Sequence, residues 1–444
     1  MAMKKSLIII IITALAALWA TDSMAQRRKV EKDSKFTPYG FFRTAAIFDT
    51  RDSKAGSEDM FYFRPLDHTF NFEGQDIYNS MSLKSYAITT RLGVNVTGYR
   101  YGAMKVDGKI ETDFYLMNGN TASLRLRHAY VDIYFDKLGY MENKFSFKVG
   151  QSWHPMAEDL PYCVNIETGA PFTPFNWSPQ LMIEYTFADR IHYTLGALYP
   201  MQFLPTGPLG ESETYIKYGL IPELYGGMSY TGKHFTAKAG VDFVGLKPRW
   251  RTLTRDYVSE DWYDRGTKVK DRLYMFSPFA YLQFEKGMFK INAKSVFAQG
   301  GDHLRLMGGY ALYDWRDIYD YKYTPIRSTV SFLSFSIGRK LQFMCMGGYM
   351  KALGTAHNLS VDEEGYCRSE DIYYSSAGDK GIAQMYRVTP TIAFNAGKLT
   401  LAVEYNNTSV QYGLSTKLDN YAIPRENLHW VTNHRVMGVV RFSL

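Results

Sequence analysis

Five ionisable side chains alternate with mostly apolar ones between residues 104 and 115. The charged positions are Lys105, Asp107, Lys109, Glu111 and Asp113. The positions between them include Met104, Val106, Ile110 and Phe114. A helix would spread the five charges around its circumference, whereas a strand places all of them on one face. The pattern therefore predicts a strand with one face toward water and the other toward an apolar surrounding.

A second group of charges breaks this simple alternation. Arg125 and Arg127 share a face with apolar Val131, while His128 and Asp132 share the other. Each arginine would cost about 2–4 kcal/mol at mid-depth in lipid. A β-bulge near His128 would switch the phase and bring both arginines and Asp132 to the aqueous side. Alternatively, both arginines lie at the outer rim. We expect a pore-lining or hydrogen-bonded role for His128.

Compact catalytic motifs are not found in the sequence. The nine histidines are scattered without metal-ligand spacing, and neither G-x-S-x-G nor a glycine-rich phosphate loop occurs. We therefore expect no catalytic residue, no metal and no cofactor. A membrane-embedded hydrolase with its residues dispersed over strands, and an adhesive or structural barrel, are the alternatives to a channel.

Period-2 alternation recurs along the chain in segments of about ten residues, which is typical of outer-membrane barrels. The predicted strands are 38–48, 84–97, 102–115, 123–135, 144–152, 180–188, 190–199, 220–230, 235–247, 273–284, 289–299, 327–338, 341–350, 385–395, 399–408 and 432–444. The last segment is amphipathic, and we expect it to close against the first. The fold class is all-β: a transmembrane antiparallel β-barrel of about 16 strands.

The predicted connections alternate in length, as short periplasmic turns and long extracellular loops do. The short ones are 97–101, 136–143, 189–190, 231–234, 285–288, 339–340 and 395–398. The long ones are 49–83, 153–179, 249–272, 300–326, 351–383 and 409–431.

The same alternation gives an inventory of lumen charges. The expected bases are Arg43, Arg91, Lys105, Lys109, Lys148, Lys238, Lys290, Lys294, Arg387, Arg435 and Arg441. The expected acids are Asp107, Glu111, Asp113, Glu184, Glu223, Asp242 and Glu404. Arg125, Arg127 and His128 join them if the bulge forms. The positive excess favours anions in a narrow pore, although any water-filled barrel needs charged residues for solvation.

Residues 153–179 follow the fifth predicted strand and so form the third external loop, which is rich in proline, aromatics and acids. Its candidate functional residues are Trp153, Glu158, Asp159, Glu167, Phe175 and Trp177. Proline stiffens a loop, and aromatic rings let it pack against a surface. We predict that the loop folds inward, narrows the pore and is held by its acids against a basic wall. An external lid or a trimer contact is the alternative.

The chain begins with the features of an export signal. Lys4 and Lys5 precede an apolar run over 7–20, and Ser23-Met24-Ala25 has the small-x-small pattern of a cleavage site. We predict a signal peptide at 1–25, a periplasmic tail at 26–36 and a barrel at 37–444. Later segments carry no run of about 18 apolar residues.

Composition fits an exported barrel. Aromatic residues make up 16% of the chain, and the mean hydropathy of -0.27 is low for a soluble core of this size. Loss of Lys4, Lys5 and Asp22 lowers the net charge from +7 to +6. This balance points to anionic solutes and not to nucleic acid. Cys163 and Cys367 fall in predicted external loops and could pair.

Several short motifs resemble the trimeric outer-membrane porins of the DcaP-like family, best over residues 39–188. They are Arg91-Leu92-Gly93, the run 109–114, the run 125–130, Gly150-Gln151-Ser152-Trp153, the run 178–185 and, further on, the run 387–390. The resemblance implies a homotrimer in the lipid of the cell outer membrane, with a third loop constricting a positively lined pore. It also implies passage of small anionic or polar solutes such as dicarboxylates, with Arg91, Arg125, Arg127 and His128 in or near the pore.

Members of that family often carry a helical periplasmic extension before the barrel. Here only residues 26–35 are available for such an extension. The third external loop, residues 153–179, is also richer in acids than a strongly anion-selective pore would suggest.

Overall fold

The structure is a computed structural model, which describes residues 34–56, 61–87, 89–117, 121–135, 144–165, 169–255, 262–375 and 378–444. The predicted signal peptide and most of the predicted periplasmic tail lie outside these residues. No helix in the described part of the chain is long and apolar enough to cross a membrane.

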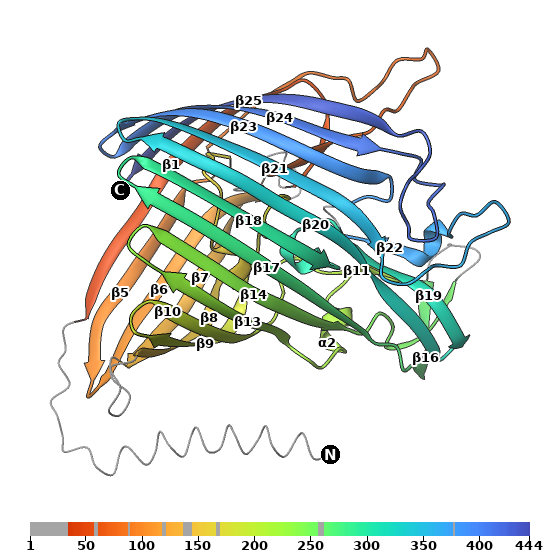
Figure 1. Cartoon of the computed structure of the whole chain (residues 1–444), viewed down its shortest axis with the longest axis horizontal. Coiled ribbons are helices and arrows are strands. Elements are labelled where there is room, and N and C mark those ends of the chain that lie inside the picture. Colours follow the sequence, from red (N-terminus) through yellow and green to blue (C-terminus); the bar gives the residue numbers. More distant parts are fainter. Residues whose placement is uncertain are drawn as a thin grey trace, which may run out of the picture.

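Within the described residues, 16 antiparallel strands close into a barrel (Figure 1). They are β1 (Lys35–Asp49), β4 (Ser82–Tyr86) continued by β5 (Arg91–Tyr101), β6 (Met104–Met117), β7 (Thr121–Phe135), β8 (Lys144–Trp153), β9 (Trp177–Phe187), β10 (Ile191–Leu198), β13 (Glu223–Thr231), β14 (Phe235–Leu246), β17 (Leu273–Lys286), β18 (Phe289–Gln299), β20 (Asp320–Gly338), β21 (Leu341–Thr355), β23 (Ile382–Ala396), β24 (Leu399–Tyr412) and β25 (His429–Ser443). β25 pairs with β1 from Phe41 opposite Ser443 to Asp49 opposite Arg435, so the sheet has no open edge there.

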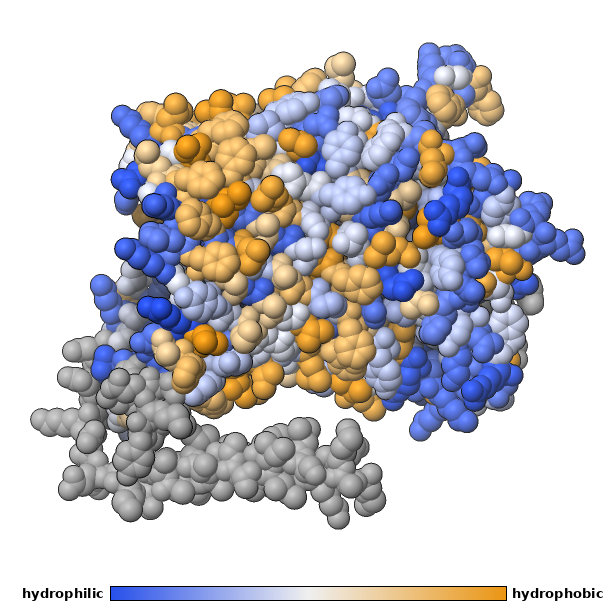
Figure 2. All heavy atoms as spheres, in the orientation of Figure 1, coloured by the Kyte–Doolittle hydropathy of each residue, from blue (hydrophilic) through white to orange (hydrophobic). Residues whose placement is uncertain are grey.

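Alternation along each strand separates two surfaces. In β17, inward positions from Leu273 to Tyr281 are buried, whereas Phe276 and Leu282 point outward and are about half exposed. Outward apolar side chains of the same kind include Leu333 on β20 and Ile392 on β23. Figure 2 shows apolar side chains gathered on the flank of the barrel, with a hydrophilic surface at the end that carries the long loops. The flank therefore suits lipid contact.

Each of the 16 segments predicted from the sequence overlaps a barrel strand, and the all-β barrel fold is confirmed. The strand ends differ. β1 begins at Lys35 instead of 38, and β20 begins at Asp320 instead of 327. The second predicted strand is divided into β4 and β5, both paired with β1. The turn expected at 97–101 is tighter, because β5 continues to Tyr101 and β6 starts at Met104.

The long connections lie at one end of the barrel and contain additional elements (Figure 1). They hold the hairpins β2 (Ser53–Gly56) with β3 (Phe61–Pro65), β11 (Thr206–Gly207) with β12 (Gly210–Glu211), and β15 (Arg251–Arg255) with β16 (Trp262–Lys268). They also hold η2 (Pro155–Ala157), α2 (Thr214–Lys217), η3 (Asp302–Leu304), β19 (Gly309–Asp317), η4 (Ser369–Asp371) and β22 (Ile372–Tyr374). We refer to residues 50–81, 154–176 and 300–319 as the first, third and sixth external loops.

Candidate functional site

The third external loop leaves the wall after β8 and reaches the opposite side of the barrel. The Tyr162 backbone N–H donates to Ser334 Oγ on β20 at 2.9 Å, and the Val164 N–H donates to Glu404 Oε2 on β24 at 2.7 Å. β24 lies on the far side of the ring from β8. Because these partners face inward, the loop crosses the inside of the barrel.

Side chains of the wall hold the first part of this loop through its backbone. Lys294 Nζ donates to the carbonyl oxygens of Met156 at 2.8 Å and Asp159 at 2.7 Å. Asn292 Nδ2 donates to the Leu160 carbonyl at 2.9 Å. One loop acid forms an ion pair with the wall: Asp159 lies 2.8 Å from Lys238 Nζ. Buried carbonyl groups need donors, so these contacts fix the loop path.

We expected several acids of this loop to pair with bases of the wall. Among the described residues, Asp159 alone does so. Glu158 is exposed and lines a cavity, and Glu167 lies outside the described residues. The wall carboxylate Glu404 even reverses the expected roles, since it accepts from the loop backbone. Charge–dipole contacts to the backbone carry most of the attachment.

The first external loop also enters the barrel. In β3, Phe61, Tyr62 and Phe63 are buried. Arg387, on the inner face of β23, donates to the carbonyls of Tyr62 at 3.1 Å, Phe63 at 3.0 Å and, in the third external loop, Ala170 at 2.9 Å. The Arg387 side chain is fully buried. It faces inward as the sequence predicts, but it is covered by the two loops and does not line open space.

A β-bulge in β7 sets the direction of two arginines. Glu111 on β6 lies opposite His128, whereas Thr112 lies opposite Leu126, so Arg127 is the extra residue. The bulge expected near His128 is therefore confirmed. Because the bulge shifts the phase, Arg125 and Arg127 both face inward, as the alternative with the bulge requires.

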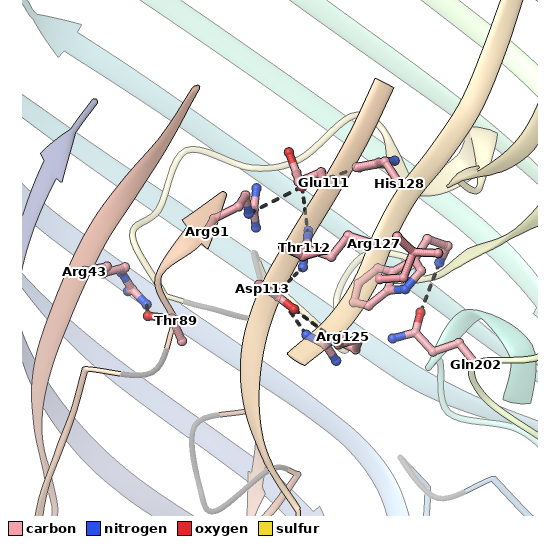
Figure 3. A network of polar contacts seen from close by, with 12 residues as sticks. Arg43, Thr89, Arg91, Glu111, Thr112, Asp113, Arg125, Arg127, His128 and Gln202 are labelled. Atoms are coloured by element: carbon pink, nitrogen blue, oxygen red, sulfur yellow. Dashed lines mark hydrogen bonds and ion pairs between the residues drawn. The ribbon is translucent and has the colours of Figure 1, made fainter. Parts of the chain in front are cut away.

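The inward arginines form a network with the acids of β6 (Figure 3). Arg125 makes two hydrogen bonds of 3.0 Å to Asp113, and Arg127 reaches Glu111 at 3.0 Å and Asp113 at 2.8 Å. Bidentate guanidinium–carboxylate geometry fixes both partners. Arg91 on β5 lies 3.4 Å from Glu111, and its side chain is 29% exposed.

Aromatic rings of the third loop and its flanking strands pack against these guanidinium groups. Arg127 lies 5.2 Å from the Trp153 ring centroid and 4.6 Å from that of Trp177, and Arg125 lies 4.7 Å from Trp177. Phe175 contacts both tryptophans, at 5.3 and 5.4 Å between ring centroids. Cation–π contact stabilises these two guanidinium groups, of which Arg127 is buried and Arg125 partly exposed.

A cavity of about 280 Å³ remains between the loops and this wall. Five arginines line it: Arg43, Arg91, Arg125, Arg127 and Arg441. Asp113 is the one carboxylate of the lining among the described residues. The third loop contributes Cys163, Val164, Asn165 and Phe175 to the opposite side. The lining therefore carries a net positive charge, which attracts anions inside low-dielectric walls.

A second cavity of about 250 Å³ adjoins another part of the wall. Its charged lining residues are Asp132, Lys148, Glu158, Glu184 and Lys238. Acids outnumber bases there, so of these two cavities the first alone has a net positive lining. The excess of bases expected for the lumen is thus present at the first cavity and absent from the second.

Three further predicted lumen bases, Lys109, Lys290 and Arg435, face inward and form ion pairs. Lys109 lies 3.5 Å from Glu111, and Lys290 lies 2.8 Å from Glu285 near the short turns. Arg435 is buried and makes two 2.8 Å hydrogen bonds to Asp49. Lys105 lies on the same face of β6 as Lys109. Predicted residues on β5, β6 and β7 thus converge on one site, whereas Lys290 and Arg435 do not join it.

Sequence reasoning missed one cluster. His154, Glu223, Asp242 and His303 are brought together and buried, with His154 Nε2 2.6 Å from Glu223 and His303 Nε2 2.9 Å from Asp242. The spacing of these residues in the sequence could not reveal the cluster, because the four residues belong to four separate segments.

The disulfide that the sequence allowed between Cys163 and Cys367 is not formed. Cys163 lines the first cavity, whereas Cys367 is buried in another loop.

A closed barrel with an apolar outer flank, a charged interior and an inward-folded third loop defines a multi-pass β-barrel of the outer membrane with porin architecture. No protein-family model matches the chain, and no curated protein sequence matches it. Several solved structures, in contrast, are similar to the chain in fold. The outer membrane channel DcaP of Acinetobacter baumannii superposes with a TM-score of 0.64 at 16% identity, over 94% of this chain and 99% of that one.

Two further structures have the same fold. The anion-selective porin from Comamonas acidovorans gives a TM-score of 0.52 at 11% identity, covering 93% of this chain and 100% of that one. OmpT of Vibrio cholerae, an outer membrane protein, gives 0.50 at 12% identity, covering 94% and 100%. The fold expected from the motifs that resemble DcaP-like proteins is therefore confirmed.

Proposed function

We propose that this protein is a passive diffusion channel for small hydrophilic solutes, with a mild preference for anions. The observation that carries the proposal is the first cavity, where five arginines and one carboxylate face a loop that crosses the lumen. An inward loop narrows the path, so a solute passes close to the guanidinium groups. Local positive potential then raises the concentration of anions.

Dicarboxylates are the solute class that fits this lining best. A guanidinium group binds a carboxylate through two parallel hydrogen bonds, and arginines on separate strands can hold the two ends of one solute. Arg91 and Arg441 lie on either side of β1. The arrangement, together with the sequence resemblance, supports small organic dianions.

Homotrimer formation is a further part of the proposal. It rests on the sequence resemblance to trimeric porins. The outer surface of the β24–β25–β1 region offers small side chains, Thr44, Ala46 and Gly438, in a shallow hollow between larger apolar residues. A second copy of the chain could pack closely there. Chemical cross-linking of protein in native membranes should give a three-chain species.

Planar-bilayer recording tests the function. We expect ohmic single-channel conductance and, in a salt gradient, a reversal potential on the anion side. Added succinate should reduce the chloride current more than equimolar propionate does, because one carboxylate engages fewer guanidinium groups. Non-conducting protein would favour the adhesive barrel. Turnover of labelled phospholipid or peptide, abolished by one Ser or His substitution, would favour the hydrolase.

A further inference from the structure

We propose that His154, Glu223, Asp242 and His303 form a binding site for one divalent transition-metal ion, with Zn²⁺ as the expected occupant. His154 Nε2 lies 2.6 Å from Glu223 Oε1 and 3.7 Å from Asp242 Oδ1. His303 Nε2 lies 2.9 Å from Asp242 Oδ2 and 3.7 Å from Glu223 Oε1. All four side chains are at most 4% exposed.

Four separate elements supply these residues. His154 opens the third external loop directly after β8, and Glu223 is the first residue of β13. Asp242 lies on β14 opposite Tyr225, and His303 lies in η3 of the sixth external loop. Donor atoms of His154, Glu223 and Asp242 all lie within 4.8 Å of one another. The fold therefore aims potential ligands from two loops and two strands at one point.

Unsatisfied carboxylate oxygens give an independent reason to expect a cation. Glu223 Oε2 and Asp242 Oδ1 are buried and have no hydrogen-bond partner among the described residues. Both residues are about 1% exposed. Two neighbouring carboxylates in such a place need compensating charge and partners for their lone pairs. A divalent ion supplies both, since its charge balances the two carboxylates while both imidazoles stay neutral.

The donor set identifies the class of ion. Two imidazole nitrogens with two carboxylates match four-coordinate zinc, whereas Ca²⁺ and Mg²⁺ prefer oxygen ligands throughout. With bonds of about 2.0–2.2 Å, neighbouring ligand atoms of a tetrahedral zinc ion are about 3.3–3.6 Å apart. The nitrogen–oxygen distances here, between 2.6 and 3.7 Å, bracket this value. The shortest of these distances, between His154 Nε2 and Glu223 Oε1, must lengthen by roughly 0.7–1.0 Å for the ion to fit.

One existing contact must change when the ion binds. The Met156 backbone N–H donates to Nδ1 of His154 at 3.1 Å. A neutral histidine that ligates through Nε2 carries its proton on Nδ1, so this N–H would have to turn away. A single neutral hydrogen bond is a small loss beside four ligand bonds to a buried ion. The Met156 amide is therefore a local reporter of occupancy.

Zinc uptake by the folded protein tests the site. Untagged wild type, Asp242→Asn, His303→Gln and the control His192→Gln would be folded with one equivalent of ZnCl₂, dialysed and measured by elemental analysis. His192 pairs with Glu184 at 3.3 Å on another part of the wall. We expect about one zinc per chain in wild type and His192→Gln, and less than a tenth of that in the other two.

Co²⁺ gives a second readout that needs no variant. Its absorption spectrum in the wild type should show the intense bands of a four-coordinate ion, and Zn²⁺ should remove them. Equal zinc content in wild type and Asp242→Asn would overturn the proposal. Where a variant fails to fold, wild-type protein without cobalt bands and without bound zinc would overturn it equally, leaving a hydrogen-bonded carboxylate–imidazole cluster.

Discussion

Arg387 and Ala170 are joined by a 2.9 Å hydrogen bond across 217 positions of the chain. The guanidinium belongs to the inner face of β23, and the carbonyl belongs to the third external loop. The same guanidinium holds two carbonyls of the first external loop. Two loops that enter the lumen are therefore fixed by one buried side chain.

Replacing this side chain should loosen both loops. In Arg387→Met, three buried carbonyls lose their donor, and we expect the free energy of unfolding to fall by about 3 kcal/mol. Single-channel current should become larger and noisier. Arg441→Met is the matched control, because the exposed Arg441 lines the cavity and has no described hydrogen bond to either loop. Equal stability of the two variants in urea titration would contradict the assignment.

Substitution of Arg91 should change the ion selectivity of the channel and leave its folding unaffected. Arg91 is partly exposed in the cavity, so Arg91→Gln removes one positive charge from the lining. We expect the anion-to-cation permeability ratio to fall by about twofold. Lys290→Gln, near the short turns and outside the cavity, should leave the ratio unchanged. The reversal potential in a salt gradient measures both variants.

A natural thiol reports on the path through the cavity. Cys163 belongs to the third loop and contributes to the cavity lining, whereas Cys367 is buried. An anionic methanethiosulfonate reagent should therefore reduce conductance by at least about half, since it adds bulk and negative charge at the narrow region. Cys163→Ser should be insensitive. Unchanged wild-type current after verified labelling would show that ions take another route.

The ordered conformation of the tip of the first external loop should depend on the ionised carboxylate of Asp76. Burial alone would raise the pKa of Asp76, but hydrogen bonds from Arg51, His68 and two backbone N–H groups outweigh it and lower the pKa. Stability from a lowered pKa is present above the ordinary carboxyl pKa and is lost as pH falls through the lowered value. The loop should therefore stay protected from protease down to about pH 4.

Substitution offers a direct check of the same contact. Asp76→Ala should expose residues 66–81 to limited proteolysis at neutral pH, because Arg51 and the loop backbone lose their acceptor. Glu73→Ala, an exposed change in the same loop, is the control. Equal cleavage rates in the two variants would argue against an ordering role for Asp76.

The sequence predicts the barrel well because each strand obeys a local rule. Alternation locates all 16 strands, and the phase error at Arg125 and Arg127 locates the bulge. Long-range contacts are different. Phe61, Tyr62 and Phe63 lie in a loop by pattern, yet they pack inside the barrel. Nothing local distinguishes an apolar loop segment that enters the lumen from one that stays outside.

The candidate site shows the same division. The residues that converge at the first cavity lie on β5, β6 and β7, which are adjacent strands. The two-residue period of each strand and the pairing of neighbouring strands therefore suffice to bring these residues together. Arg387 shares the inward phase, but its burial depends on where two loops end. His154 and His303 meet only because both loops return to β13 and β14. Contacts of that kind depend on the tertiary path of the chain and leave no periodic signal.

The extra residue in β7 has an implication for how such proteins diversify. Arg125 faces the lumen because Arg127 is left without a partner position in β6; regular pairing of the same residues would turn Arg125 toward lipid. Loss of the Arg127 codon would restore regular pairing and keep Arg125 facing the lumen, but it would remove one guanidinium group from the network. Insertion of one residue into a regular strand would need a similar bulge, or it would turn the apolar side chains beyond it toward the lumen. The bulge thus lets one strand present two successive charged faces to the lumen without any change in the strands beside it.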